Sequence, residues 1–433
     1  MIGTIIISII TFVGITLSIL LFPHIRIGRF RLDTYWIIAL LGALVLVIFS
    51  FAPIKEVFTQ LTSNSEVNPL KIIVLFFSMT FLSIFLDETG LFRFLAKKAT
   101  KIAKNNQISL FFIFYLLTAF LTVFASNDIV ILTLTPFICF FCRNTKINSL
   151  PYLIGEFAAA NTWSMMLIIG NPTNIYLATS ANIDFLNYLK VMALPTIVAG
   201  LVELSIIFLL FRKELLKPMS ISEDDFQIDS RTDLWIGVVH LVVCLVFLIF
   251  SSYVDIEMWI IALLSATSLF IFNLTIRLIT KKRWRYVTES LGRLPYQLIP
   301  FFLSMFVIVV ALNTQGISQN IAKFLANGEP TWVYGFSSFI SANIINNIPM
   351  SILFSNLTTS LTGSGYIQAT YATIIGSNLG AFLTPLGALA GIMFSALLMK
   401  YEVKFSFVGF IKYGAIISIP TISASLLVLF LIA

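Results

Sequence analysis

Long apolar runs without charge alternate along the chain with short basic stretches. Residues 2–22, 34–52 and 234–254 contain no Asp, Glu, Lys or Arg. A run of about 18 or more apolar residues is long enough to cross a bilayer as a helix. The first run lacks the basic residues that precede a cleaved signal peptide, so we expect it to be retained as a helix. The pattern predicts a polytopic α-helical membrane protein.

Composition supports the same class of protein. Hydrophobic residues make up 58% of the chain and charged residues 11%, against about 25% charged residues in a soluble domain. A net charge of +7 could suggest a nucleic-acid partner. However, the basic residues form short clusters between apolar runs, which is the pattern of cytoplasmic loops in membrane proteins. We therefore expect the chain to lie in a lipid bilayer and not to bind nucleic acid.

The basic clusters also set the expected topology. If all of them face the cytoplasm, both chain termini lie outside, and the chain between Lys104 and Arg143 enters and leaves by one face. Residues 108–126 and 129–142 then form a re-entrant helical hairpin with its tip at Asn127-Asp128. The alternative is an ordinary pair of spans, because the first limb is nearly long enough to cross at about 1.5 Å per residue. The clusters lie at residues 26–31, 93–104, 143–146, 212–231, 277–293 and 400–404.

An internal repeat relates residues 68–211 to residues 295–433. Its landmarks recur in the same order at nearly constant offsets: Ser78 to Gly90 matches Ser304 to Gly316, Asn127 to Ile129 matches Asn346 to Ile348, and Asn161 with Gly170 matches Asn378 with Gly387. The charge topology starts the two copies on opposite faces, so they are expected to be inverted. Inverted repeats with broken helices are typical of secondary transporters. Two scaffold helices in residues 1–67 and two in residues 212–294 complete the prediction: an all-α fold of about ten transmembrane helices plus two re-entrant hairpins.

Four places in the repeats interrupt apolar segments with Pro, Gly, Asn or Asp. Irregular backbone at membrane depth is tolerated only where it is buried in protein or lines a wet cavity. Two places are the hairpin tips, at residues 126–128 and 343–349, and two are breaks, at residues 170–174 and 384–387. None contains Arg or Lys, so an anion would rest on helix N-termini and on amide and hydroxyl donors, and a neutral oxyacid would also fit. The expected substrate-binding residues are Ser126, Asn127, Asn171, Thr173, Asn174, Asn346, Asn347, Asn378 and Thr384.

Three acidic residues fall within apolar segments, where a carboxylate is costly and usually functional. Asp128, Glu156 and Glu203 all lie in the first copy, so we expect ion coupling on that side. Asp128 is the first choice because it lies at a helix break. Glu203 is expected either to face a polar partner such as Lys190 or to lie near the inner surface. Asp87 and Glu88, which are adjacent in sequence, are expected to mark the inner, solvated end of a helix.

Nothing in the chain predicts an enzyme or a resident cofactor. The two histidines, His24 and His240, are far apart in sequence, whereas a catalytic or metal site needs a cluster. Cys139 and Cys142 have the C-x-x-C spacing but no accompanying Cys or His cluster, so metal or redox use is disfavoured. Trivalent arsenic does bind thiols, which leaves the pair of interest.

Three sets of motifs stand at the tips and breaks: Asn127-Asp128 with Leu132-Thr133-Leu134-Thr135-Pro136, Asn346-Asn347-Ile348-Pro349, and Ile375-Gly376-Ser377-Asn378-Leu379 leading to Thr384-Pro385-Leu386-Gly387. They resemble the arsenite permease family, within the ion transporter superfamily that also contains divalent anion/sodium symporters. The resemblance covers most of the chain from about residue 68 onward. It implies a scaffold domain, a mobile transport domain with elevator-like movement, and a homodimer. The Ser-Asn-Thr signatures of the dicarboxylate branch are absent from both tips.

The combined prediction is a secondary active transporter of a small anion or oxyacid, working by alternating access. The coupling ion is expected to be H⁺, or Na⁺ bound near Asn127 and Asp128. The alternative function is a Na⁺/H⁺ antiporter of the same superfamily, which the acids of the first copy would suit. A channel would explain inverted broken helices less well.

Overall fold

The structure is a computed structural model that describes residues 1–22, 24–27, 30–63, 68–219, 230–251, 256–280 and 285–432. Of the expected basic clusters, Arg29 and the stretches 220–229 and 281–284 lie outside the described residues. The described chain is nearly all helical, as predicted. The exception is a two-stranded antiparallel ribbon, β1 (His24–Ile27) and β2 (Phe30–Asp33), in which His24 lies opposite Asp33. The ribbon lies in the stretch that was expected to be only a basic loop.

Two apolar helices and a short amphipathic one precede the first repeat. Helices α1 (Ile2–Leu21) and α2 (Thr34–Ile48) pack against each other, and α2 also packs against the first helix of the second repeat. Helix α3 (Ile54–Thr62) begins after Pro53, a residue whose fixed φ suits a helix start.

The first repeat contains seven α-helices and a broken segment. A left-handed glycine, Gly90 at φ 84°, separates the first two helices. The elements are α4 (Pro69–Glu88), α5 (Leu91–Ala103), α6 (Gln107–Phe124), α7 (Asn127–Thr145), α8 (Leu150–Trp163), the 3₁₀ turns η1 (Ser164–Met166) and η2 (Ile168–Gly170), α9 (Pro172–Ser180) and α10 (Phe185–Leu215).

The second repeat has the same order of elements. Gly316, the counterpart of Gly90, also adopts a left-handed conformation at φ 72°, which supports the alignment of the two copies. Helices α11 (Arg231–Ile249), α13 (Met258–Thr280) and α14 (Arg285–Gly292) link the copies. The second copy consists of α15 (Leu298–Thr314), α16 (Ile317–Leu325), α17 (Pro330–Ile345), α18 (Asn347–Thr358), α19 (Ser364–Gly380), α20 (Leu389–Lys400) and α21 (Phe407–Ile432).

Seven described helices are long and apolar enough to cross a membrane, or eight if α15 and α16, bent by 80°, form one span. The sequence predicts about ten. Two of the expected spans, Ile2–Ser18 and Thr34–Ile48, count as shorter apolar helices, and the first break divides another segment into α8 and α9. Helices α6 and α7 are both among the seven. Their lengths alone therefore allow either a re-entrant hairpin or two spans.

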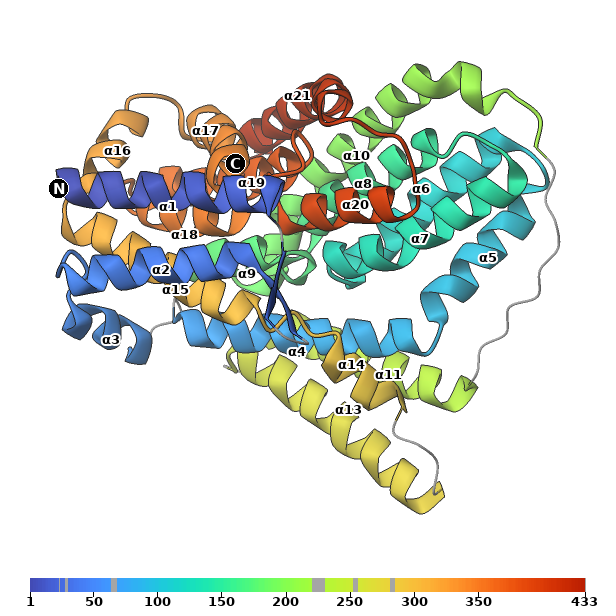
Figure 1. Ribbon diagram of the computed structural model, residues 1–433, viewed down its shortest axis with the longest axis horizontal. Helices are drawn as coiled ribbons and strands as arrows, with labels where there is room; N and C mark the ends of the chain where they lie inside the picture. The colour runs from blue at the N-terminus through green and yellow to red at the C-terminus, as the bar shows by residue number, and fades with distance from the viewer. Residues whose placement is uncertain are drawn as a thin grey trace.

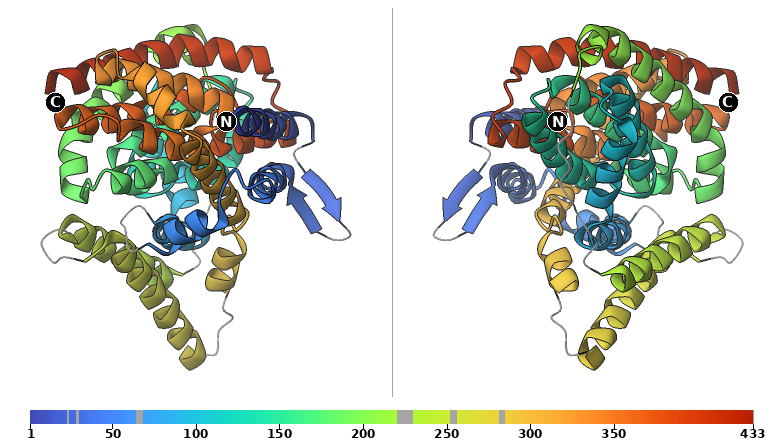
Figure 2. Two further views of the ribbon diagram at one scale, coloured as in Figure 1. Left: turned by 90° about the vertical axis from the view of Figure 1, so that its left-hand side faces the viewer. Right: turned by 90° about the vertical axis from the view of Figure 1, so that its right-hand side faces the viewer.

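The two candidate hairpins lie at opposite ends of the molecule. In Figure 1, α6 and α7 lie on the right with α5, whereas α17 and α18 lie on the left with α16. Helices α11 and α13 pack against each other and extend away from the rest, as both views of Figure 2 show.

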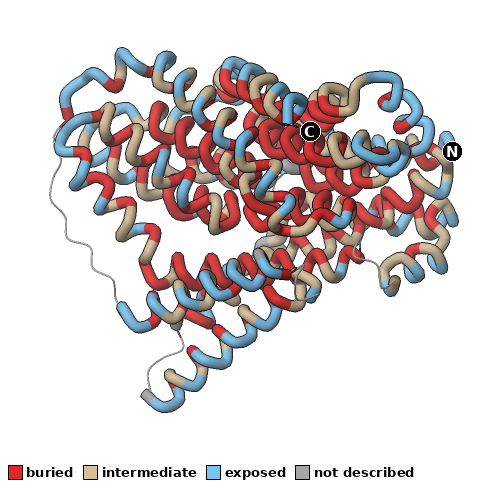
Figure 3. Tube along the Cα trace, turned by 180° about the vertical axis from the view of Figure 1, so that it is seen from behind, coloured by how far each residue is buried: buried red, intermediate tan, exposed pale blue. Residues whose placement is uncertain are grey.

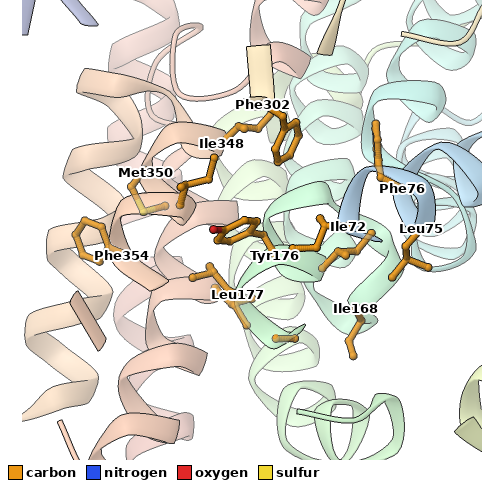
Figure 4. Close-up of a cluster of buried hydrophobic side chains, with 14 of the residues drawn as sticks. Ile72, Leu75, Phe76, Ile168, Tyr176, Leu177, Phe302, Ile348, Met350 and Phe354 are labelled. Atoms are coloured by element: carbon orange, nitrogen blue, oxygen red, sulfur yellow. The ribbon is translucent and has the colours of Figure 1, made fainter. Parts of the chain in front are cut away.

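Buried residues concentrate on the central helices, and the outermost helices carry most of the exposed ones (Figure 3). One buried apolar cluster lies where both repeats meet. In Figure 4, Tyr176 of α9 lies between Ile72 of α4 and Ile348 of α18, with Phe302 of α15 close by. This core holds the short helices that follow one break and one tip.

Candidate functional site

The first break separates α8 from α9 and confirms the predicted interruption at residues 170–174. Helix α8 ends at Trp163, and Pro172 follows Asn171, the N-cap residue of α9. A Cβ atom at Gly170 would lie 2.1 Å from the carbonyl oxygen of Ser164, so only glycine allows this close return of the backbone. The side-chain amide of Asn174 donates hydrogen bonds to the carbonyl oxygens of Ser164 (2.8 Å) and Leu167 (3.2 Å). The break is thus closed by its own polar residues.

Asn378 of α19 joins the first break to the second repeat. Its Oδ1 accepts hydrogen bonds from Ser164 Oγ (2.9 Å) and Asn171 Nδ2 (3.1 Å), and its Nδ2 donates to Asn174 Oδ1 (2.7 Å). Asn171 Oδ1 in turn accepts from the amide and the hydroxyl of Thr173, both at 3.1 Å. We call Asn171, Thr173, Asn174 and Asn378 the asparagine clasp. All four are at most 2% exposed, and their polar atoms are largely used within the clasp.

The second tip closes the second break in a similar way. Helix α19 ends at Gly380 and α20 begins at Leu389, which confirms the predicted interruption at residues 384–387. Asn343 Nδ2 donates to the Gly380 carbonyl (2.9 Å) and its Oδ1 accepts from Thr384 Oγ1 (2.8 Å). Asn346 Nδ2 donates to the carbonyl of Leu386 (3.0 Å). Carbonyls freed at the helix break are therefore bonded by the asparagines of the tip.

Two further contacts fix the backbone of this tip. The backbone amide of Asn347 donates to the carbonyl of Gly387 at 3.0 Å. Asn346 has φ 69° and ψ 153°, a backbone conformation outside the left-handed helical region that residues other than glycine rarely adopt. Its Oδ1 accepts from the amide of Ile348 at 3.3 Å, which caps the N-terminus of α18.

The first tip is held less tightly. Asn127 Nδ2 donates to Asn161 Oδ1 of α8 at 3.2 Å, and Asn127 Oδ1 accepts from the amide of Asp128. The buried Ser126 Oγ has no hydrogen-bond partner among the described residues. The carboxylate of the half-buried Asp128 likewise forms no ion pair with a described residue. This pair of oxygen-bearing side chains is therefore available to a ligand.

A cavity of about 990 Å³ is lined by residues of both the first tip and the second break. Ser126 and Asp128 line it on one side, and Pro385 and Leu386 on another. Its remaining lining is mainly apolar. The polar and charged members of that remainder are Asp33, Tyr35, Thr80, Arg293, Tyr296, Gln297, Ser395, Lys400 and Ser406.

A smaller cavity of about 110 Å³ shares three repeat-equivalent lining positions with the large one. Thr80 and Ile84 of α4 line the large cavity, and their equivalents in α15, Phe306 and Val310, line the small one. Likewise Met393 lines the large cavity and its equivalent Tyr176 the small one. The remaining lining residues of the small cavity are Gln60, Ser63, Val309, Asn313 and Asn356. The two cavities are thus related by the repeat but differ about ninefold in volume.

Arg293 forms an ion-pair cluster at the edge of the large cavity. Its Nη1 lies 2.7 Å from Asp87 Oδ2 and 2.5 Å from Glu88 Oε1. Partial burial disfavours the charged guanidinium, but the two carboxylates outweigh this and raise the pKa of Arg293. Asp87 is only 2% exposed, so the expectation of a solvated role for it is wrong. The sequence does not show that Arg293, more than 200 residues away, neutralises the end of α4.

The other embedded acids, Glu156 and Glu203, do not line the cavity. Glu156 accepts a hydrogen bond from Thr135 Oγ1, which lies 2.9 Å from both of its carboxylate oxygens. Glu203 bonds to Tyr115 and Thr162. A polar partner is one of its two expected settings; the partners are these two hydroxyls and not Lys190. Cys139 and Cys142 are buried in α7 with free thiols.

The predicted site residues therefore separate into two groups. Ser126 and Asp128 face the large cavity, and Asn127 lies directly between them in sequence. The clasp residues, together with Asn346, Asn347 and Thr384, hold the breaks and do not line that cavity. Sequence reasoning missed Thr80, Arg293 and Lys400 as cavity residues. Their only sequence signal is polarity near the end of an apolar segment, which many surface residues share.

The chain has two repeats, two tips, two breaks and a cavity lined by residues of one tip and one break. These features and the family match define a polytopic membrane transporter and not an enzyme. The chain belongs to the citrate transporter family (CitMHS), whose sequence profile matches residues 33–369. It is an anion permease of the ion transporter superfamily, as its motifs predict. The arsenical pump membrane protein of Escherichia coli (strain K12) is 26% identical over 366 residues, which cover 81% of this chain and 84% of that protein.

Two solved transporters share the fold at low sequence identity. The YdaH transporter of Alcanivorax borkumensis aligns with a TM-score of 0.56 and 13% identity, covering 99% of this chain and 97% of that one. Neisseria gonorrhoeae MtrF, described as one of a class of antimetabolite efflux pumps, aligns with a TM-score of 0.53 and 15% identity, covering 98% and 94%. Both likenesses support the polytopic membrane fold.

Proposed function

We propose that this chain is a secondary active transporter that moves a small oxyacid or oxyanion, arsenite-like in chemistry, by alternating access. The observation that carries the proposal is the pair of repeat-related cavities of about 990 Å³ and 110 Å³. Alternating access requires two routes to one central site, with one route open at a time. A large and a nearly closed copy of the same cavity are what such a cycle produces.

The large cavity should face the cytoplasm. Arg293 and Lys400 line it, and both belong to clusters that the positive-inside rule places on that side. The state described is then open to the inside, with both chain termini outside. A homodimer remains the expectation that the family resemblance implies.

The chemistry at the first tip favours a small neutral or weakly charged oxyacid over a polyanion. Ser126 offers a hydroxyl and Asp128 a carboxylate, and no Lys or Arg lies at either tip or break. A polyanion such as citrate would approach Asp128 against charge repulsion. The two cavity cations, Arg293 and Lys400, could attract an anion, but Arg293 is already paired with two carboxylates. The E. coli relative's description as an arsenical pump agrees with the oxyacid.

Asp128 is the proposed coupling residue. It is the one embedded acid of the three that faces the cavity, so water and ions can reach its carboxylate. It would bind and release H⁺ during the cycle. Na⁺ is the alternative, because Ser126 Oγ and the Asp128 carboxylate are oxygen ligands with no other described side-chain partner. The same feature supports the second candidate function, a Na⁺/H⁺ antiporter, which would need no oxyacid.

Transport by purified protein in liposomes tests the proposal. Uptake of arsenite, antimonite, citrate and sulfate would be measured with an imposed pH gradient, an imposed Na⁺ gradient or neither. We expect gradient-driven movement of arsenite or antimonite and little citrate transport. Na⁺/H⁺ exchange without any oxyacid movement would favour the second candidate. Transport of citrate alone would overturn the choice of cargo.

A further inference from the structure

Glu203 of α10 is a buried carboxyl group away from the cavity that the proposed function does not use. It is 2% exposed. Its Oε2 accepts a hydrogen bond from Thr162 Oγ1, near the end of α8, and its Oε1 lies 2.7 Å from Tyr115 Oη of α6. Tyr115 Oη lies at the same distance, 2.7 Å, from the carbonyl oxygen of Gly200. Three helices thus meet at one carboxyl group.

Counting protons shows which form of Glu203 this geometry needs. Two oxygen atoms 2.7 Å apart require a hydrogen between them. Tyr115 Oη makes two such contacts, with Gly200 O and Glu203 Oε1, yet a phenol carries one hydrogen. A carbonyl oxygen carries none. A second hydrogen, on Glu203, gives each of the two contacts its own donor.

The third neighbour of the phenol does not change this count. Trp163 Nε1 lies 3.2 Å from Tyr115 Oη and can only donate. The indole fits there because residue 200 is glycine: a Cβ atom would lie 2.6 Å from Trp163 Cζ2. With Glu203 protonated, each hydrogen has one acceptor: Trp163 and Glu203 donate to Tyr115, Tyr115 donates to Gly200, and Thr162 donates to Glu203. No oxygen pair is left without a hydrogen.

The surroundings offer no other way to neutralise the carboxyl group. No Lys, Arg or His forms an ion pair with Glu203 among the described residues. Helix α10 packs against α6, α8, α11 and α21. On α11, Asp233 and His240 are bonded to Arg277 and Ser268. Arg231 of α11 and Lys412 of α21 are exposed. An unpaired carboxylate in an apolar interior is strongly disfavoured.

We propose that Glu203 is a proton-binding site that stays occupied, and that the neutral acid is a positioning residue for the first break. Ser164, the first residue after α8, begins that break and bonds to the asparagine clasp. Holding Thr162 two residues earlier therefore fixes where the break begins. The consequence for transport rests on the proposed function: Glu203 positions the site, whereas Asp128 carries the coupled ion.

Glu203→Gln is the first test, because a glutamine amide reproduces the protonated acid. Its Nε2 would donate to Tyr115 and its Oε1 would accept from Thr162. We expect wild-type thermal stability, gradient-driven accumulation and pH profile. Glu203→Met, of similar size but without polar atoms, should lower the melting temperature by several degrees and reduce transport. The proposal is wrong if Glu203→Gln loses gradient-driven accumulation but still exchanges substrate.

Infrared difference spectroscopy provides a test that does not depend on transport. The spectrum of the wild-type protein minus that of Glu203→Gln should contain a protonated carboxylic C=O band over about pH 5 to 8, a range in which an ordinary glutamate is ionised. Tyr115→Phe should shift this band, because the acid loses its acceptor. A carboxylate band in the same difference spectrum would refute the bound proton, whatever the protein transports.

Discussion

Asp128 and Asn347 occupy equivalent positions in the two repeats, but only Asp128 can ionise. Each is a first-turn residue of the second limb of its hairpin. Asn347 is bonded through its backbone to Gly387, whereas Asp128 faces the large cavity. An acceptor is favourable near a helix N-terminus in either case. The ionisable group is present only where water can reach it, so coupling should depend on one repeat.

Asp128→Asn should therefore separate folding from coupling. Asparagine has nearly the same size and is also a good N-terminal residue, so the fold should survive. We expect gradient-driven accumulation to fall by at least about tenfold, equivalent to about 1.4 kcal/mol, while substrate exchange at equal concentrations continues. Glu156→Gln is the control, since Glu156 is buried away from the cavity and bonded to Thr135. If Asp128→Asn preserves uphill transport, then Asp128 only caps the helix and has no coupling role.

Gly387→Ala tests how closely the second break must be packed. The added Cβ would lie 2.8 Å from the carbonyl oxygen of Gly380 and 2.9 Å from Asn343 Oδ1. Both atoms take part in the bonds that close the break, so neither can move freely. We expect a loss of about 1–3 kcal/mol, typical of overpacking, measured as a lower melting temperature in detergent. Gly365→Ala in α19 is the matched control, because its Cβ would meet only Pro330 Cγ at 3.6 Å; an equal loss there would disprove the packing argument.

At the scale of the elements, the sequence alone predicted where helices end better than it predicted the hydrogen-bond partners of those ends. Proline, glycine and asparagine within apolar segments located both tips and both breaks, because each residue type disfavours a continuous helix for a local reason. The partner of each break is not a local property. Asn378 reaches Asn171 across 207 residues, and Tyr115 reaches Glu203 across 88. Such pairs depend on how the repeats fold together, so the clasp was predicted as a substrate site.

The hairpin formed by α6 and α7 has a direct topological test. Lys104 and Arg143 flank its two limbs and are exposed. Single cysteines at these positions, in a chain whose buried Cys139, Cys142 and Cys244 are replaced by alanine, would be treated with a membrane-impermeant thiol reagent. Both should react from the cytoplasmic side. Asn327, exposed before α17, should react from the other side and is the control. Labelling of Lys104→Cys and Arg143→Cys from opposite sides would make α6 and α7 two spans.

At the scale of the whole molecule, the ends of the repeats' first helices are held by unequal interactions. Arg293 pairs with Asp87 and Glu88 of α4 at the edge of the large cavity. The equivalent of Glu88 is Thr314 of α15, whose hydroxyl donates to Glu56 of α3 at 3.2 Å. Two short ion pairs between partly buried groups are stronger than one exposed 3.2 Å hydrogen bond from a hydroxyl to a carboxylate. The cavity that is open is thus bordered by the stronger link, and this asymmetry is built into the sequences of α4 and α15.

Exchange of the two cavities during transport is the most demanding prediction. Met393 lines the open cavity and its repeat equivalent, Tyr176, the closed one. In the state described, half-buried Met393→Cys should react with a thiol reagent from the cytoplasmic side, while Tyr176→Cys should be protected because residue 176 is only 1% exposed. Adding substrate with the driving gradient should slow the first reaction and speed the second from outside, since one cavity closes as the other opens. Ala372→Cys, in the fully buried part of α19, should stay unreactive throughout. If substrate speeds labelling at both Met393→Cys and Tyr176→Cys at once, the two cavities belong to a continuous channel, and alternating access is wrong for this protein.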